Sequence, residues 1–180
     1  MSKNKLIDAC KSRAAQAFIR EAERSFGDER IESPIEEAML WELVAQGLNA
    51  GMEVCIGSHQ VGEGGQTLID VGDPSPLAGA SPDRLILFHQ VRIEGYRVDF
   101  VIAVDIKRGK YRDMLVVECD GHDYHERTKE QARRDKSRDM KLQSIVGKVL
   151  RFTGSEIWSD PVACSREAIS ALWERAEFEG

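Results

Sequence analysis

The most constraining feature of this sequence is a short apolar run that ends in acidic and imidazole side chains, between Met114 and His125. The run Leu115–Val117 is rich in β-branched residues and is typical of a strand buried on both faces. Glu118 and Asp120 follow two residues apart, so an extended strand points both carboxylates to one face. Such carboxylates repel each other and stay ionised only if a cation, hydrogen-bond donors or water compensates them. The alternative is a simple strand-ending turn at Asp120 with Glu118 in solvent.

A second acidic residue, Asp99, also lies in a strand-like context. The segments 85–93 and 96–104 are predicted strands joined by Glu94 and Gly95, a typical hairpin connection. Asp99 is followed by five apolar residues, although aspartate is a poor strand former. We therefore expect a partner that holds it, either within a site or as an ion pair with Arg92 or Arg97.

A third acidic residue, Glu36, lies at the start of a predicted helix. Ser33 as N-cap, Pro34 at the first helical position and Glu36 three residues after the cap form a capping-box pattern. On a helical wheel Glu36 also falls within the apolar face that contains Ile35 and Met39. A carboxylate that faces a core needs a partner there, so Glu36 is expected both to cap the helix and to face a site.

The remaining pattern predicts an α/β protein. We expect a helical extension at 1–30, with its helix at about 5–26, then a core at 31–160 and a C-terminal helix at 161–180 packed on it. Residues 52–56 form a possible strand, and the Gly- and Pro-rich segment 57–82 is expected to be a long surface loop, with a short hairpin around 67–71 as an alternative within it. A charged helix at 128–146 leads to a strand at 148–152, and this helical crossover predicts a mixed sheet flanked by helices. The narrow apolar stripe expected on that helix consists of Ala132, Leu142, Ile145 and Val146.

Composition limits the classes of protein that this chain can belong to. No apolar run approaches the roughly 20 residues of a membrane span, and the first residues do not resemble a signal peptide. Four widely spaced cysteines without a C-x-x-C motif argue against a zinc site and favour reduced thiols in a cytoplasmic protein. The net charge is −6, yet residues 121–151 carry 9 Lys and Arg against 5 Asp and Glu. A local basic segment matters more for phosphate binding than the total charge.

Taken together, these motifs resemble the PD-(D/E)XK nuclease superfamily, and within it the very-short-patch-repair type of small bacterial endonuclease domain. The resemblance covers about 33–158 and depends on the order and spacing of five pieces: Ser33–Glu36, Tyr96–Phe100, Val117–Gly121 with His125, Asp135–Leu142 and Val149–Phe152. It implies a restriction-endonuclease-like αβββαβ core and metal-dependent hydrolysis of phosphodiester bonds, with DNA as the expected substrate. The chain departs from the superfamily pattern at one position, where Asp120 stands in place of the usual lysine.

The resemblance and the chemistry of phosphodiester cleavage together assign roles to the candidate residues. Mg²⁺ or Mn²⁺ is expected as the cofactor, because hard cations prefer carboxylate and carbonyl oxygens. The expected ligands are Asp99, Glu118 and the main-chain carbonyl of Cys119, and the carboxylates of Glu36 and Asp120 are expected to converge on the same cation. His125 is the expected general base or phosphate donor, or else a helix-capping histidine. The residues expected to contact nucleic acid are Lys129, Gln131, Arg133, Arg134 and Arg138.

Two other classes of function remain open from the sequence. The same fold with an altered motif can serve as a nucleic-acid-binding or regulatory module that does not cleave. A protein-interaction domain whose carboxylates are held by arginines is the third alternative. The sequence also leaves a homodimer open.

Overall fold

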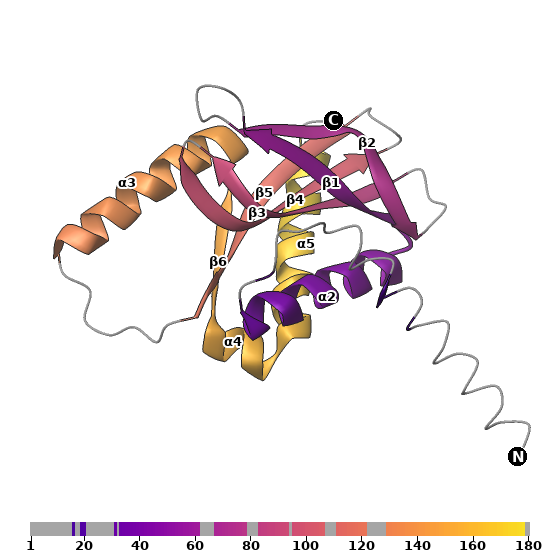
Figure 1. The fold of residues 1–180 in the computed structure, drawn as a ribbon, viewed down its shortest axis with the longest axis horizontal. Coiled ribbons are helices and arrows are strands. Elements are labelled where there is room, and N and C mark those ends of the chain that lie inside the picture. The colour runs from indigo at the N-terminus through magenta and orange to yellow at the C-terminus, as the bar shows by residue number, and fades with distance from the viewer. Residues whose placement is uncertain are drawn as a thin grey trace, which may run out of the picture. The chain divides into compact units, whose positions relative to one another are not determined.

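The computed structural model of the chain describes residues 16, 19–20, 31, 33–61, 67–78, 83–93, 95–106, 111–121 and 129–178. The contacts divide the chain into Met1–Arg30 and Ile31–Gly180. In the first unit the described residues Gln16, Ile19 and Arg20 are helical, and the rest of the helix expected at 5–26 lies outside the described residues. The elements of the second unit are α2 (Pro34–Asn49), β1 (Glu53–Val61), β2 (Thr67–Ala78), β3 (Arg84–Ile93), β4 (Tyr96–Ile106), β5 (Tyr111–Asp120), α3 (Lys129–Val146), β6 (Val149–Thr153), α4 (Gly154–Ser159) and α5 (Pro161–Phe178) (Figure 1).

The strands form one mixed sheet in the order β2-β1-β3-β4-β5-β6. The pairs β1–β3 and β5–β6 are parallel, whereas β1–β2, β3–β4 and β4–β5 are antiparallel. The expected α/β architecture with a mixed sheet and a helical crossover before the last strand is confirmed. The long loop expected across 57–82 is wrong at 57–61 and 67–78, which belong to β1 and β2. The short hairpin considered around 67–71 lies within β2. Antiparallel pairing with register irregularities near Cys55 and Ile56 accommodates the glycines and prolines of this segment.

Helices cover both faces of the sheet, and each face has its own core (Figure 1). On one face Leu142 and Val146 of α3 pack with Ile86, Phe88 and nearby valines of β3 to β5. On the other face α2 and α5 pack on each other and on the strands, over buried residues such as Leu85 and Leu87. The predicted stripe of α3 is confirmed at Leu142 and Val146, but it is wrong at Ile145, which is 50% exposed.

The helix α2 approaches the sheet closely at Gly47. A Cβ atom at this position would lie 2.7 Å from Leu85 Cδ2 and 2.8 Å from Val54 Cγ2. Ser33 caps the helix, because its hydroxyl accepts a hydrogen bond from the main-chain N–H of Glu36 at 3.3 Å. Gly47 thus brings the C-terminal end of α2 close to the sheet, and Ser33 caps its N-terminal end. No helix in the described part of the chain is long and apolar enough to span a bilayer.

Candidate active site

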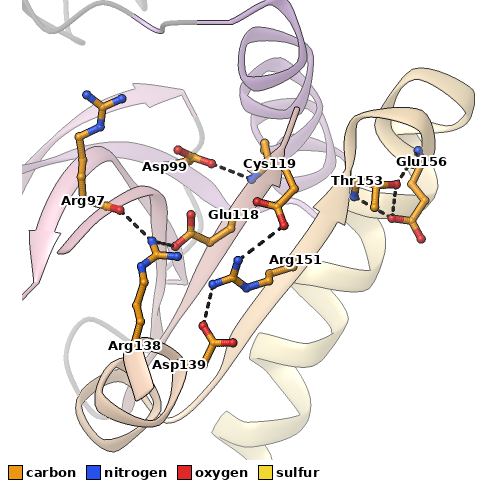
Figure 2. Close-up of polar contacts among 10 residues, drawn as sticks. Arg97, Asp99, Glu118, Cys119, Arg138, Asp139, Arg151, Thr153 and Glu156 are labelled. Carbon is orange, nitrogen blue, oxygen red and sulfur yellow. Dashed lines mark hydrogen bonds and ion pairs between the residues drawn. The ribbon is translucent and has the colours of Figure 1, made fainter. Parts of the chain in front are cut away.

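Asp99 lies where the pairing between β4 and β5 ends. The last pair of this ladder is Phe100 with Val117, so Asp99 and Glu118 are the next residues to face each other. Asp99 does not continue the ladder through its main chain. Its Oδ2 accepts a hydrogen bond from the main-chain N–H of Cys119 at 2.7 Å (Figure 2). This bond explains why an aspartate is tolerated within a buried strand, and it is the partner that the sequence did not identify.

Glu118 is buried and bound to an arginine of α3. Only 5% of the residue is exposed, and its Oε1 accepts a hydrogen bond from Arg138 Nη2 at 2.5 Å. The same Nη2 donates to the main-chain carbonyl of Arg97 at 2.9 Å (Figure 2). Burial raises the pKa of Glu118 to about 7, and the negative charge of Asp99 adds to this effect, whereas Arg138 opposes it. Desolvation therefore outweighs the ion pair at this carboxyl group.

Asp120 belongs to a second ion-pair group that connects β5, β6 and α3. Arg151 of β6 lies with Nη1 3.5 Å from Asp120 Oδ2 and with Nη2 2.6 Å from Asp139 Oδ1 (Figure 2). In the parallel register Arg151 is the partner of Glu118, so its side chain shares a face with that carboxylate. At the position where the PD-(D/E)XK pattern that the sequence resembles has a lysine, this chain has an aspartate that faces an arginine from the neighbouring strand.

Glu36 reaches the same end of the sheet from the first turn of α2. It is 7% exposed, and its carboxylate accepts hydrogen bonds from Ser33 Oγ at 2.9 Å and from Gln90 Nε2 at 2.8 Å. The sequence predicted that Ser33 and Glu36 cap the helix and that Glu36 faces a site. The Ser33 cap and the burial of Glu36 are confirmed, whereas a role of Glu36 in a site stays a prediction. The bond to Gln90 of β3 was not expected.

Gln90 is the one residue other than glycine with a positive φ, +51°, in the described part of the chain. Left-handed backbone costs a residue with a side chain about 1–2 kcal/mol. The residues before Gln90 that face α3 are Ile86 and Phe88, whereas those after it are Val91 and Ile93. The alternation of the strand is therefore shifted by one residue at Gln90, which directs its side chain toward α2 instead of α3. A polar pair, His89-Gln90, within an apolar run was the available sequence signal.

The carboxylates act on one another electrostatically, but each also has its own donor or cation. The pKa of Asp99 is raised by burial and then by the charges of Glu36 and Asp120, against the opposing effect of the Cys119 N–H. Burial also raises the pKa of the Cys119 thiol, with further contributions from Asp99, Glu36 and Glu118. Among the described residues, no three Asp, Glu, His or Cys side chains lie close enough together to hold a metal ion. The expected convergence of all four carboxylates on one point is thus not seen in this arrangement, because like charges repel and separate donors are available.

The remaining predicted residues fall into four groups. His125 lies outside the described residues, and Lys129 and Gln131 belong to the first turn of α3, where the main chain alone is described. Arg133 and Arg134 are exposed on α3. Arg138 is directed into the site rather than into solvent, with its guanidinium 6.0 Å from the centre of the Tyr96 ring.

Comparison with known proteins supports the fold. Residues 85–172 match the model of the family REase_MTES_1575, which is restriction-endonuclease-like. The matched stretch includes Asp99, Glu118 and Asp120, whereas Glu36 precedes it. No curated protein and no solved structure matches the chain. The match supports the PD-(D/E)XK superfamily, and the very-short-patch-repair type stays a prediction. Over residues 85–172 the sequence is thus similar to a restriction-endonuclease-like family, and the mixed sheet flanked by helices is consistent with that fold.

Proposed function

We propose that this protein is a divalent-metal-dependent endonuclease that hydrolyses phosphodiester bonds of DNA. The observation that carries the proposal is the pair Asp99 and Glu118, which face each other at the end of the β4–β5 ladder inside a restriction-endonuclease-like domain. Both carboxyl groups have a raised pKa because burial disfavours their charged forms. A cation placed between them would relieve this penalty.

The chemistry of the donors fits Mg²⁺ or Mn²⁺. Asp99, Glu118 and the main-chain carbonyl of Cys119 offer hard oxygen ligands, and these ions prefer such ligands over thiolates and imidazoles. A bound ion of this kind polarises the phosphate and lowers the pKa of a nearby water. The high pKa of the Cys119 thiol keeps it protonated, so its sulfur is a poor ligand and its carbonyl is the relevant atom.

Within this proposal, Arg138 competes with the cation for Glu118. Its guanidinium holds Glu118 Oε1, and it would have to move away for that oxygen to bind a metal. A phosphate of the substrate offers Arg138 an alternative anionic partner. Arg138 would then neutralise phosphate charge while the carboxylate becomes available, so substrate and metal are expected to bind cooperatively.

The expected path of the DNA follows α3. Arg133 and Arg134 are exposed on the helix whose Arg138 enters the site. Contacts from these arginines to phosphates carry no sequence information and serve to position the substrate.

A second candidate is a nucleic-acid-binding module that does not cleave. Two ion pairs favour this candidate, because Arg138 already neutralises Glu118 and Arg151 already faces Asp120. In this alternative the ion pairs are permanent parts of the structure, and phosphate binding by α3 is the whole function.

Plasmid nicking distinguishes the two candidates. We expect the purified protein to convert supercoiled plasmid to open circles with Mg²⁺ or Mn²⁺, and we expect no conversion with EDTA. Asp99→Ala is expected to lose nicking, and Arg133→Ala, Arg134→Ala is expected to reduce it through weaker DNA binding. If wild-type protein binds the plasmid but leaves it intact with both metals, the binding-module candidate is correct.

A further inference from the structure

Gln90 combines an unusual backbone conformation with a specific contact to the candidate site. Its positive φ turns the side chain toward α2, where Nε2 donates to Glu36 Oε2 at 2.8 Å. The hydrogen bond also fixes the orientation of the amide, since the amide oxygen would be repelled by the carboxylate. A strained backbone persists only where the surrounding structure or a function requires it.

The position of Gln90 relates it directly to Asp99. The pairs His89–Phe100 and Val91–Val98 flank Gln90 and Asp99, so these two residues occupy facing positions on β3 and β4. In β4 the alternation shifts at the same point, because Val98 and Val101 both lie in the core under α3. The alternation of both strands therefore shifts at the facing positions Gln90 and Asp99.

One atom of Gln90 lacks a partner. The amide oxygen Oε1 is buried and has no hydrogen-bond donor among the described residues. Buried acceptors in native proteins are usually satisfied, and an exception calls for an explanation. A water molecule carried by a divalent cation is a strong donor, and Mg²⁺ in particular retains several waters when it binds proteins.

We propose that Gln90 is a positioning residue of the metal site, which holds Glu36 through Nε2 and accepts a hydrogen bond from a cation-bound water through Oε1. This inference depends on the proposed metal-dependent function. It explains the left-handed backbone, because regular strand geometry would direct the side chain toward α3 and away from Glu36. Partners that orient the ligands of a metal typically contribute 10–100-fold to metal affinity or activity.

The test is calorimetric titration with Mn²⁺ of two variants. Both variants remove the amide group of Gln90, but only one of them relieves the strain of the left-handed backbone. Gln90→Gly removes the side chain and relieves the left-handed conformation, whereas Gln90→Met retains the length and the strain but lacks both polar atoms. We expect the dissociation constant for Mn²⁺ to rise about tenfold or more in both variants. We also expect the melting temperature of Gln90→Gly to lie above that of Gln90→Met, because only glycine relieves the left-handed strain while both variants lose the donor to Glu36. Gln143→Ala, which changes an exposed glutamine of α3, is the control and should bind Mn²⁺ like wild type.

A double-mutant cycle with Glu36→Gln separates positioning from a general structural effect. If Gln90 acts through Glu36, adding Gln90→Gly to Glu36→Gln should weaken Mn²⁺ binding by much less than it does in wild type. Additive losses, unchanged affinity in Gln90→Gly, or affinities that simply follow the melting temperatures would overturn the inference and leave the nuclease proposal intact. A wild-type protein that binds no Mn²⁺ would overturn both.

Discussion

At the scale of single residues, the site depends on how the negative charges of the buried carboxyl groups are stabilised. Asp99 uses a main-chain N–H, Glu118 uses a guanidinium, and Glu36 uses a hydroxyl and an amide. Donors of this kind stabilise a charged carboxylate, yet the pKa of Glu118 is still raised to about 7 because burial dominates. The protonation state of Glu118 is thus coupled to anything that adds or removes positive charge nearby.

Removal of Arg138 tests the strength of this coupling. Arg138→Ala leaves Glu118 buried without its ion-pair partner, so we expect a loss of about 3 kcal/mol in the free energy of unfolding at pH 8. The loss should be smaller at pH 5, where Glu118 becomes protonated. Arg134→Ala, which removes an exposed arginine from the same helix, should change stability by less than about 0.5 kcal/mol. Urea denaturation of both variants measures this difference, and equal stabilities at pH 8 would show that the Arg138–Glu118 pair contributes nothing.

The raised pKa of Glu118 predicts a pH dependence of stability with a definite sign. The unfolded chain releases this proton near pH 4.5, whereas the folded protein retains it up to a pKa of about 7. The stabilisation from the protonated form is therefore complete below pH 4.5 and is lost as the pH rises through 7. Relative to Glu118→Gln, the metal-free wild type should lose on the order of 3 kcal/mol across this range. Urea denaturation of the two proteins at several pH values from 4.5 to 8 measures this loss. If the free energies of unfolding of the two proteins change with pH in parallel, the prediction is contradicted.

At the scale of elements, the position of α2 determines whether Glu36 reaches the site. Gly47 allows the helix to lie against Leu85 and Val54, with no room for a Cβ atom. We expect Gly47→Ala to destabilise the protein by about 1–3 kcal/mol through overpacking, despite the better helix propensity of alanine. Gly154→Ala is the matched control, since its added Cβ would meet ordinary contacts of 3.5 Å or more. Thermal unfolding should therefore separate the two variants. If Gly47→Ala is as stable as wild type, the helix is not held in place by this contact.

The exposed arginines of α3 lead to a separate prediction about DNA binding. Replacement of both Arg133 and Arg134 by alanine should weaken binding of a labelled oligonucleotide in fluorescence anisotropy. The slope of log affinity against log salt should also fall by about 0.9 for each lost phosphate contact on duplex DNA. Arg166→Ala, an exposed change on α5, is the control for loss of charge alone. Equal slopes in wild type and the double variant would move the binding surface away from α3.

Sequence patterns predicted most elements but not the contacts between them. The strands at 85–93 and 96–104, the helical crossover and the capped start of α2 follow from local signals of burial, turn and capping. The strand β2 was not predicted beyond 67–71, because the glycine and the two prolines that follow are typical of loops. Spacing in the sequence indicated Asp99, Glu118 and Glu36 as candidates, but it did not indicate that Gln90 contacts Glu36 or that Arg151 contacts Asp120. These contacts depend on the positive φ of Gln90 and on the parallel register of β5 and β6, which have no local sequence signature.

At the scale of the whole molecule, the acidic chain concentrates its positive charge in one segment. The net charge is −6, but residues 121–151 contain 9 Lys and Arg against 5 Asp and Glu and include most of α3. Two of these arginines, Arg138 and Arg151, contact the acidic groups of β5, whereas Arg133 and Arg134 are exposed. The segment thus connects the candidate cation site to the surface expected to bind phosphates, which accounts for the expected cooperativity between metal and DNA.

The central claim is that Asp99 and Glu118 bind a divalent cation once Arg138 releases Glu118. Crystals of the protein grown with a DNA oligonucleotide and Mn²⁺, measured for anomalous scattering, test it most directly. We predict an anomalous peak about 2 Å from carboxylate oxygens of both Asp99 and Glu118, with the Arg138 guanidinium on a phosphate instead of on Glu118. An anomalous map with no peak at these carboxylates, and with Arg138 still bonded to Glu118, would contradict the account.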